Sequence, residues 1–231
     1  MAERICPIRQ RLEGWFKRVP IDEDELTGEE LSLATHLQEH HPNDEADTRS
    51  LIATCDPPSL ETVSLAFACP WRLYESFGSL KRLYGFGHIA PEYIHVLQGN
   101  LYEWNGEIID ASSLDAVLSH YNDTDMVEAG MILHMICAAH DVGYITFTNY
   151  QSICIRAIHT IVRDPNLASW SDYAAVICDQ LPSALETYPS TIRSAYALHM
   201  DWLISNALSP WVTLDWEKVR AVGIAHYATL K

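Results

Sequence analysis

The sequence lacks any long apolar run. None of its 231 residues lies in a stretch that approaches the roughly 20 apolar residues of a membrane-spanning helix. The first residues, "MAERICPIRQRLEGW", mix charged and apolar side chains and do not resemble a secretory signal. We therefore expect a cytoplasmic protein without a membrane partner, long enough to bury a sizeable core.

Motifs for thiol or phosphate chemistry are also lacking. The six cysteines are scattered without a C-x-x-C pair. Three of them, Cys137, Cys154 and Cys178, lie among apolar neighbours, and we expect these three to be buried and to pack as small apolar side chains. No G-x-S-x-G is present, and "YGFGH" at 84–88 does not have the spacing of a phosphate-binding loop. The sequence indicates no cofactor.

Basic residues are scarce in one region. The net charge is −16, and residues 19–61 carry twelve acidic side chains against one basic, Arg49, a net of −11. Such a segment repels nucleic acid and attracts a basic protein surface, although it could equally be a solvated face that keeps the protein soluble. The residues expected to contact a partner are Asp22, Glu23, Asp24, Glu25, Glu29, Glu30, Asp44, Glu45 and Asp47.

The apolar periodicity predicts a mainly α protein: an acidic N-terminal helical segment over 1–54 and a helical core over 55–231, together one compact unit. Predicted N-caps are Thr27, Ser112 or Ser113, Thr148 and Ser169, and Gly143 is expected in the left-handed conformation after a helix. The expected helices span about 4–18, 28–41, 114–121, 125–142, 149–163, 170–181, 190–206 and 214–231.

Residues 55–110 are ambiguous. "SLETVSLAFA" fits a helix or a strand, and Asn105-Gly106 in "LYEWNGEIID" fits a short β-hairpin near 100–110 or an ordered loop.

The stretch "HMICAAHDVGYI", residues 134–145, ends in an adjacent His and Asp. Metal-dependent phosphohydrolases of the HD type hold their metal with such a pair, and here the set would be His120, His140 and Asp141, with the last Asp undetermined among Asp172, Asp179 and Asp201. The alternative, which we favour, is the capped end of a core helix, where a His suits the helix dipole.

The stretch "HLQEH" matches the H-x-x-E-H pattern of some zinc enzymes, with His36 and His40 as ligands. No third ligand can be named, and the helix is broken at Pro42. We favour an exposed helix end.

Residues 125–182 contain a long helix ending in "AAHDVGYIT", a polar step "FTNY" and a third helix opening at Ser169-Trp170. This order resembles a bacterial family defined as domain of unknown function 1266. The resemblance implies a helical fold element and no site.

The sequence thus predicts a non-catalytic protein-binding protein, specifically an immunity protein that neutralises a bacterial toxin or effector through its acidic surface. An HD-type phosphohydrolase using His120, His140 and Asp141 is one alternative, and a secretion chaperone or scaffold is another.

Overall fold

The computed structural model describes residues 44–72, 80–89, 91–122, 124–184, 200 and 202–230. The helices expected at 4–18 and 28–41, and most of the one at 190–206, lie outside these ranges. Within them every regular element is a helix, which confirms the mainly α fold, and no helix there has the length and apolar character needed to cross a membrane. The elements are α3 (Asp44–Ile52), α4 (Leu60–Arg72), η1 (Leu80–Leu83), η2 (Pro91–Tyr93), α5 (Ile94–Trp104), α6 (Ala111–Leu118), α7 (Met126–Asp141), α8 (Phe147–Val162), α9 (Trp170–Ala184), α11 (Pro210–Thr213) and α12 (Trp216–Ala228).

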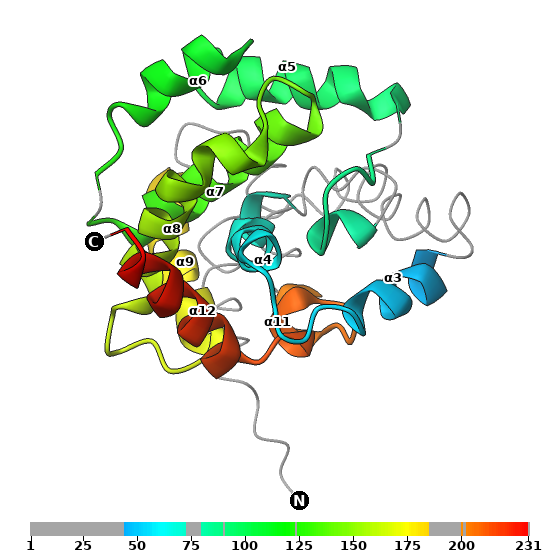
Figure 1. Ribbon diagram of the computed structural model, residues 1–231, viewed down its shortest axis with the longest axis vertical. Helices are drawn as coiled ribbons and strands as arrows, with labels where there is room; N and C mark the ends of the chain where they lie inside the picture. The colour runs from blue at the N-terminus through cyan, green and yellow to red at the C-terminus, as the bar shows by residue number, and fades with distance from the viewer. Residues whose placement is uncertain are drawn as a thin grey trace, which may run out of the picture.

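Helix α4 lies at the centre of the molecule, seen almost end-on in Figure 1, and it contacts α7, α8, α11, α12 and η1. The stretch that fitted a helix or a strand is therefore a helix. Ser59 opens it, because its Oγ accepts a hydrogen bond from the Thr62 amide at 3.1 Å. Every residue from Thr62 to Arg72 is buried, which explains why the sequence shows no amphipathic period here.

Helices α7 and α8 pack beside each other along α4. Asp125 caps α7 by accepting hydrogen bonds from the amides of Val127 and Glu128 at 2.8 and 3.0 Å. Gly143 follows the helix with φ +80°, which confirms its predicted left-handed conformation. The predicted start of α8 was wrong: Thr146, not Thr148, is the N-cap residue, and its side chain makes no cap hydrogen bond.

Side chains cap the starts of both α6 and α9, and the cap of α6 is a capping box. In α6 the N-cap is Asp110, so the expected caps Ser112 and Ser113 were wrong. Ser113 instead occupies the third helical position, where its amide donates to Asp110 Oδ1 at 2.8 Å. Ser169 does cap α9 as predicted, accepting from the Asp172 amide at 3.2 Å while Asp172 Oδ2 accepts from the Ala168 amide at 2.9 Å.

Residues 100–110 do not form a β-hairpin, one of the two possibilities left open, because α5 occupies the first half of this stretch and an ordered turn follows it. The Ile108 amide donates to Leu101 O at 3.1 Å, and both side chains are fully buried. Gly106 has φ +93°, which closes the helix. An Asn-Gly pair suits a left-handed position in either setting, so the sequence signal could not separate a helix end from a hairpin.

The C-terminal helices complete the core around an aromatic cluster. The last helix begins at Trp216 rather than near Leu214, because Asp215 caps it and a separate short helix, α11, precedes it. The aromatic cluster comprises Phe67, Trp170, Tyr173, Trp211 and Trp216, with ring centroids 5.0–6.3 Å apart in the contacting pairs.

At the N-terminal side of the described chain, α3 packs against η1. The division into a segment over 1–54 and a core over 55–231 stays a prediction, since most of the first segment lies outside the described residues.

Candidate functional site

The carboxylate of Asp141 lies at the end of α7 between two arginines. Its Oδ2 accepts hydrogen bonds from Arg72 Nη2 at 2.7 Å and from Arg82 Nη2 at 3.0 Å. All three side chains are fully buried. We call this group the Arg72–Asp141–Arg82 cluster. Two arginines on one carboxylate oxygen form a charge-assisted contact that is strong only because the surroundings exclude water.

Three elements bring the cluster together. Arg72 is the last residue of α4, Arg82 belongs to η1, and Asp141 ends α7. Arg72 Nε also donates to Arg82 O at 2.8 Å, so one guanidinium joins the backbone of η1 to the carboxylate of α7. Its Cζ lies 5.9 Å from the ring centroid of Phe86, within cation–π range. The cluster thus fixes the ends of two core helices to one short segment.

The charges in the cluster support one another. Burial raises the pKa of Asp141, but the guanidinium charges of Arg72 and Arg82 and their hydrogen bonds outweigh it and hold that pKa below its ordinary value. Burial likewise lowers the pKa of Arg72, but the charge of Asp141 and its hydrogen bond, together with Cys137 and Cys69, raise that pKa above its ordinary value. Asp141 is therefore ionised at neutral pH.

His140 faces a different set of groups from those of Asp141. Its Nδ1 lies 3.2 Å from Ile145 O, across the turn that Gly143 makes. Its ring meets Phe86 edge-on with centroids 4.4 Å apart, and Phe86 in turn packs on Phe147 at 5.1 Å. The imidazole thus contacts a backbone carbonyl on one side and the ring of Phe86 on another.

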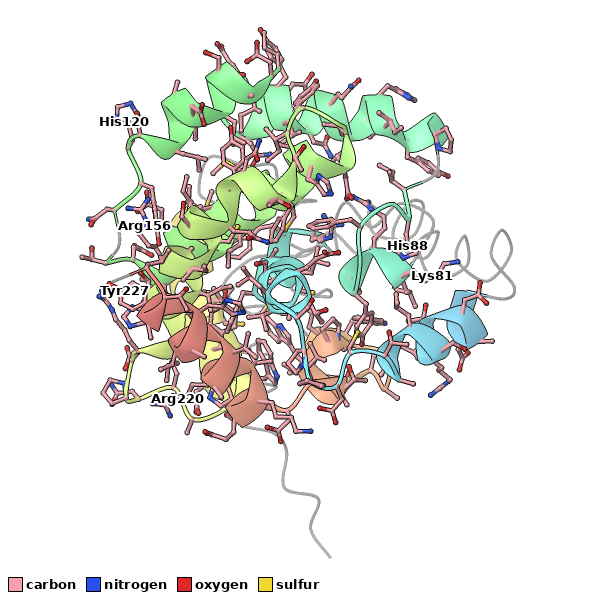
Figure 2. All side chains as sticks on the ribbon, viewed as in Figure 1. Lys81, His88, His120, Arg156, Arg220 and Tyr227 are labelled. Carbon is pink, nitrogen blue, oxygen red and sulfur yellow. The ribbon has the colours of Figure 1, made fainter. Side chains whose placement is uncertain are left out.

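Those residues of the HD-type alternative that the structure describes do not converge, and Asp201 lies outside the described residues. His120 is exposed just beyond α6, and Figure 2 shows it at the edge of the molecule. Asp172 is engaged in the cap of α9, and Asp179 is exposed on the same helix. Within the described ranges, no three His, Cys, Asp or Glu side chains are grouped so that they could hold a metal ion. The adjacent His140 and Asp141 therefore take part in two separate structural contacts.

The predicted partner surface is described only at its C-terminal end. The predicted contact residues from Asp22 to Glu30, and also His36 and His40, lie outside the described residues, and for Asp44 the backbone alone is described, at the start of α3. Glu45 and Asp47 both project from α3, with side chains 64% and 56% exposed. Each forms an ion pair with one basic side chain: Glu45 with Arg49 at 2.8 Å and Asp47 with Lys81 at 3.1 Å.

The cysteines behave in part as the sequence suggested. Burial raises the pKa of the Cys69, Cys137 and Cys154 thiols, that of Cys137 to about 12. These thiols stay protonated at neutral pH and pack as small apolar groups. Cys178 differs from the expectation, since it is partly exposed on α9.

Sequence reasoning missed Arg72 and Arg82. The sequence did hold one indication. Arg72 ends the mainly apolar run "LETVSLAFACPWR", where burying a charged side chain without a partner costs free energy. Its acidic partner is 69 residues away, however, and no local pattern connects them.

The comparisons with known proteins give no relative: no family model matches the chain, and neither the curated proteins nor the solved structures searched give a match. The resemblance to domain family 1266 therefore stays a prediction. The described fold is a helical bundle around α4, with a buried ion cluster at one end of the central helices.

Proposed function

We propose that this chain is a cytoplasmic protein-binding protein that neutralises a basic protein partner by direct contact, in its most specific form an immunity protein against a bacterial toxin or effector. The observation that carries the proposal is the charge of residues 19–61, twelve acidic side chains against one basic. Glu45 and Asp47, on the described end of that segment, are more than half exposed.

The physical advantage of such a surface is speed and selectivity. An inhibitor has to reach its target before the target acts, and an acidic face opposite a basic cleft raises the association rate by 10- to 1,000-fold at low ionic strength. Toxins that act on nucleic acid carry basic clefts for their substrate, so an acidic protein surface can compete for the same charges.

The HD-type phosphohydrolase has less support. A metal site needs a second and a third ligand close to the first. Two guanidinium groups lie against Asp141, where their positive charges disfavour a metal cation, and His120 is exposed just beyond α6. A secretion chaperone or scaffold would use the same acidic segment, and it differs from an immunity protein in leaving its partner active.

The test uses the full-length chain and the protein encoded by the adjacent gene. Both are co-expressed, and association is followed by surface plasmon resonance at several salt concentrations. The Glu29→Lys/Glu30→Lys variant is compared with Asp179→Lys/Glu217→Lys, which reverses two exposed charges on α9 and α12. We expect the first pair to slow association by about tenfold at low salt and the second to change it little.

Growth of cells that express the adjacent protein separates the candidate roles. Rescue of growth by the wild-type chain supports an immunity protein, and binding without rescue supports a chaperone or scaffold. Absence of binding, or equal loss in the two variants, contradicts the proposal. Stoichiometric metal in the purified protein that is lost in His140→Ala would favour the phosphohydrolase.

A further inference from the structure

The two most exposed large apolar side chains of the described residues lie on one short turn. Tyr102 is 50% exposed at the end of α5, and Ile109 is 58% exposed just before α6. The neighbouring apolar residues Leu101 and Ile108 are fully buried. The turn therefore places one pair of apolar side chains in the core and another in solvent. We call residues 102–110 the α5–α6 turn.

The α5–α6 turn is held in place by hydrogen bonds that its backbone amides donate. The Glu107 amide donates to Tyr102 O at 3.0 Å, and the Ile109 amide donates to Ser113 Oγ at 2.9 Å. Gly106 lies so close to α6 that a Cβ there would be 2.9 Å from Val117 Cγ2. A surface fixed in this way loses little conformational freedom when a partner binds.

In the sequence on either side of the turn, every charged side chain from 83 to 155 is acidic when His is taken as neutral. No Lys or Arg occurs between Arg82 and Arg156. Glu107 and Asp110 are exposed on the turn itself, and hydrogen bonds from Ser113 lower the pKa of Asp110, which keeps it ionised. Figure 1 shows α5 and α6 along the upper edge, on the opposite side of the bundle from α11.

We propose that the α5–α6 turn is a docking surface for a basic protein segment, which covers Tyr102 and Ile109 with an apolar side chain and places Lys or Arg against Glu107 and Asp110. An exposed tyrosine and an exposed aliphatic side chain on one fixed turn, with two carboxylates on the same turn, have the composition of an interface centre. Charge complementarity identifies the occupant: a second copy of this chain would bring the same carboxylates face to face. The α5–α6 turn lies outside residues 19–61 in the sequence, and the proposal does not depend on the immunity role.

The probe is a synthetic amphipathic peptide of lysine and leucine with one tryptophan, added to the full-length chain. Isothermal titration gives its Kd, and hydrogen–deuterium exchange gives the site. We expect protection concentrated at 101–114 and a Kd about tenfold weaker for Tyr102→Ser/Ile109→Ser than for wild type. Val212→Ser/Ile224→Ser removes two comparably exposed apolar side chains elsewhere, and its Kd should equal that of wild type.

Three results overturn the proposal: equal Kd values for the two double variants, protection spread over all acidic surfaces, or equally tight binding of a peptide that contains lysine but no apolar residue. Self-association of the free chain that is lost in Tyr102→Ser/Ile109→Ser would also overturn it, in favour of a dimer interface. The Glu107→Gln variant should weaken peptide binding at low salt only. Thermal melting of each variant confirms that its fold is intact.

Discussion

Arg72 and Asp141, 69 residues apart in the sequence, form an ion pair of 2.7 Å in which both side chains are fully buried. Arg82 completes the group from a third element. Removing one member of such a cluster costs more than the pair contributes, since the remaining charges stay buried without compensation.

We therefore expect Asp141→Asn to lower the free energy of unfolding by about 3–5 kcal/mol, measured by urea denaturation. Asp47→Asn, which breaks the exposed pair with Lys81, should cost less than about 1 kcal/mol. If both variants lose the same small amount, the cluster does not stabilise the fold as described. If Asp141→Asn does not fold, the same denaturation is measured on Asp141→Glu, which keeps the negative charge.

The depressed pKa of Asp141 makes its contribution dependent on pH. A carboxylate with a lowered folded-state pKa stabilises the protein above its unfolded-state pKa, and this stabilisation is lost as the pH falls through the folded-state value. The difference in unfolding free energy between wild type and Asp141→Asn should be constant above about pH 5 and shrink below about pH 4. Denaturation curves from acid to neutral pH measure it, and a difference that grows toward acid contradicts the assignment.

Gly130 on α7 lies where three elements meet. A Cβ there would overlap the Trp71 ring and lie 2.8 Å from the Tyr173 hydroxyl, so Gly130→Ala should destabilise by about 1–3 kcal/mol. Gly99 on α5 has no atom within 4 Å of the same position, and Gly99→Ala should stabilise by about 0.5–1 kcal/mol. Thermal melting should give a lower Tm for Gly130→Ala and a higher Tm for Gly99→Ala. Equal changes in Tm would show that α7 does not approach α4 and α9 so closely.

Thiol reactivity checks the packing of the core. In a Cys6→Ser background, Cys178 should react with Ellman's reagent at pH 8 well before the other thiols, because it alone among the described cysteines is not buried. Cys69, Cys137 and Cys154 should react only on unfolding, since burial raises their pKa. Stopped-flow absorbance with and without guanidinium makes the comparison, and fast reaction of Cys137 in the native protein would contradict it.

The sequence located the helices that have clear start and stop signals and left α4 and α5, which lack them, ambiguous. Gly143 and Ser169 marked a helix end and a helix start correctly, because a left-handed glycine and a serine cap are local requirements. The Asn105-Gly106 pair misled because two structures share that requirement. Arg72 was missed because the value of a buried charge depends on a partner that only the tertiary structure brings near.

Trp211 donates from Nε1 to Ala66 O at 2.9 Å across 145 residues, and Trp170 Nε1 donates to Leu214 O at 2.8 Å. During synthesis α4 leaves the ribosome before Trp211 and Leu214 have been translated. Part of its apolar surface therefore stays exposed until the C-terminal helices have been made. A chain that stops before Trp211 leaves α4 without part of its cover. Such truncated products are expected to be substrates for chaperones and proteases rather than smaller working versions of the protein.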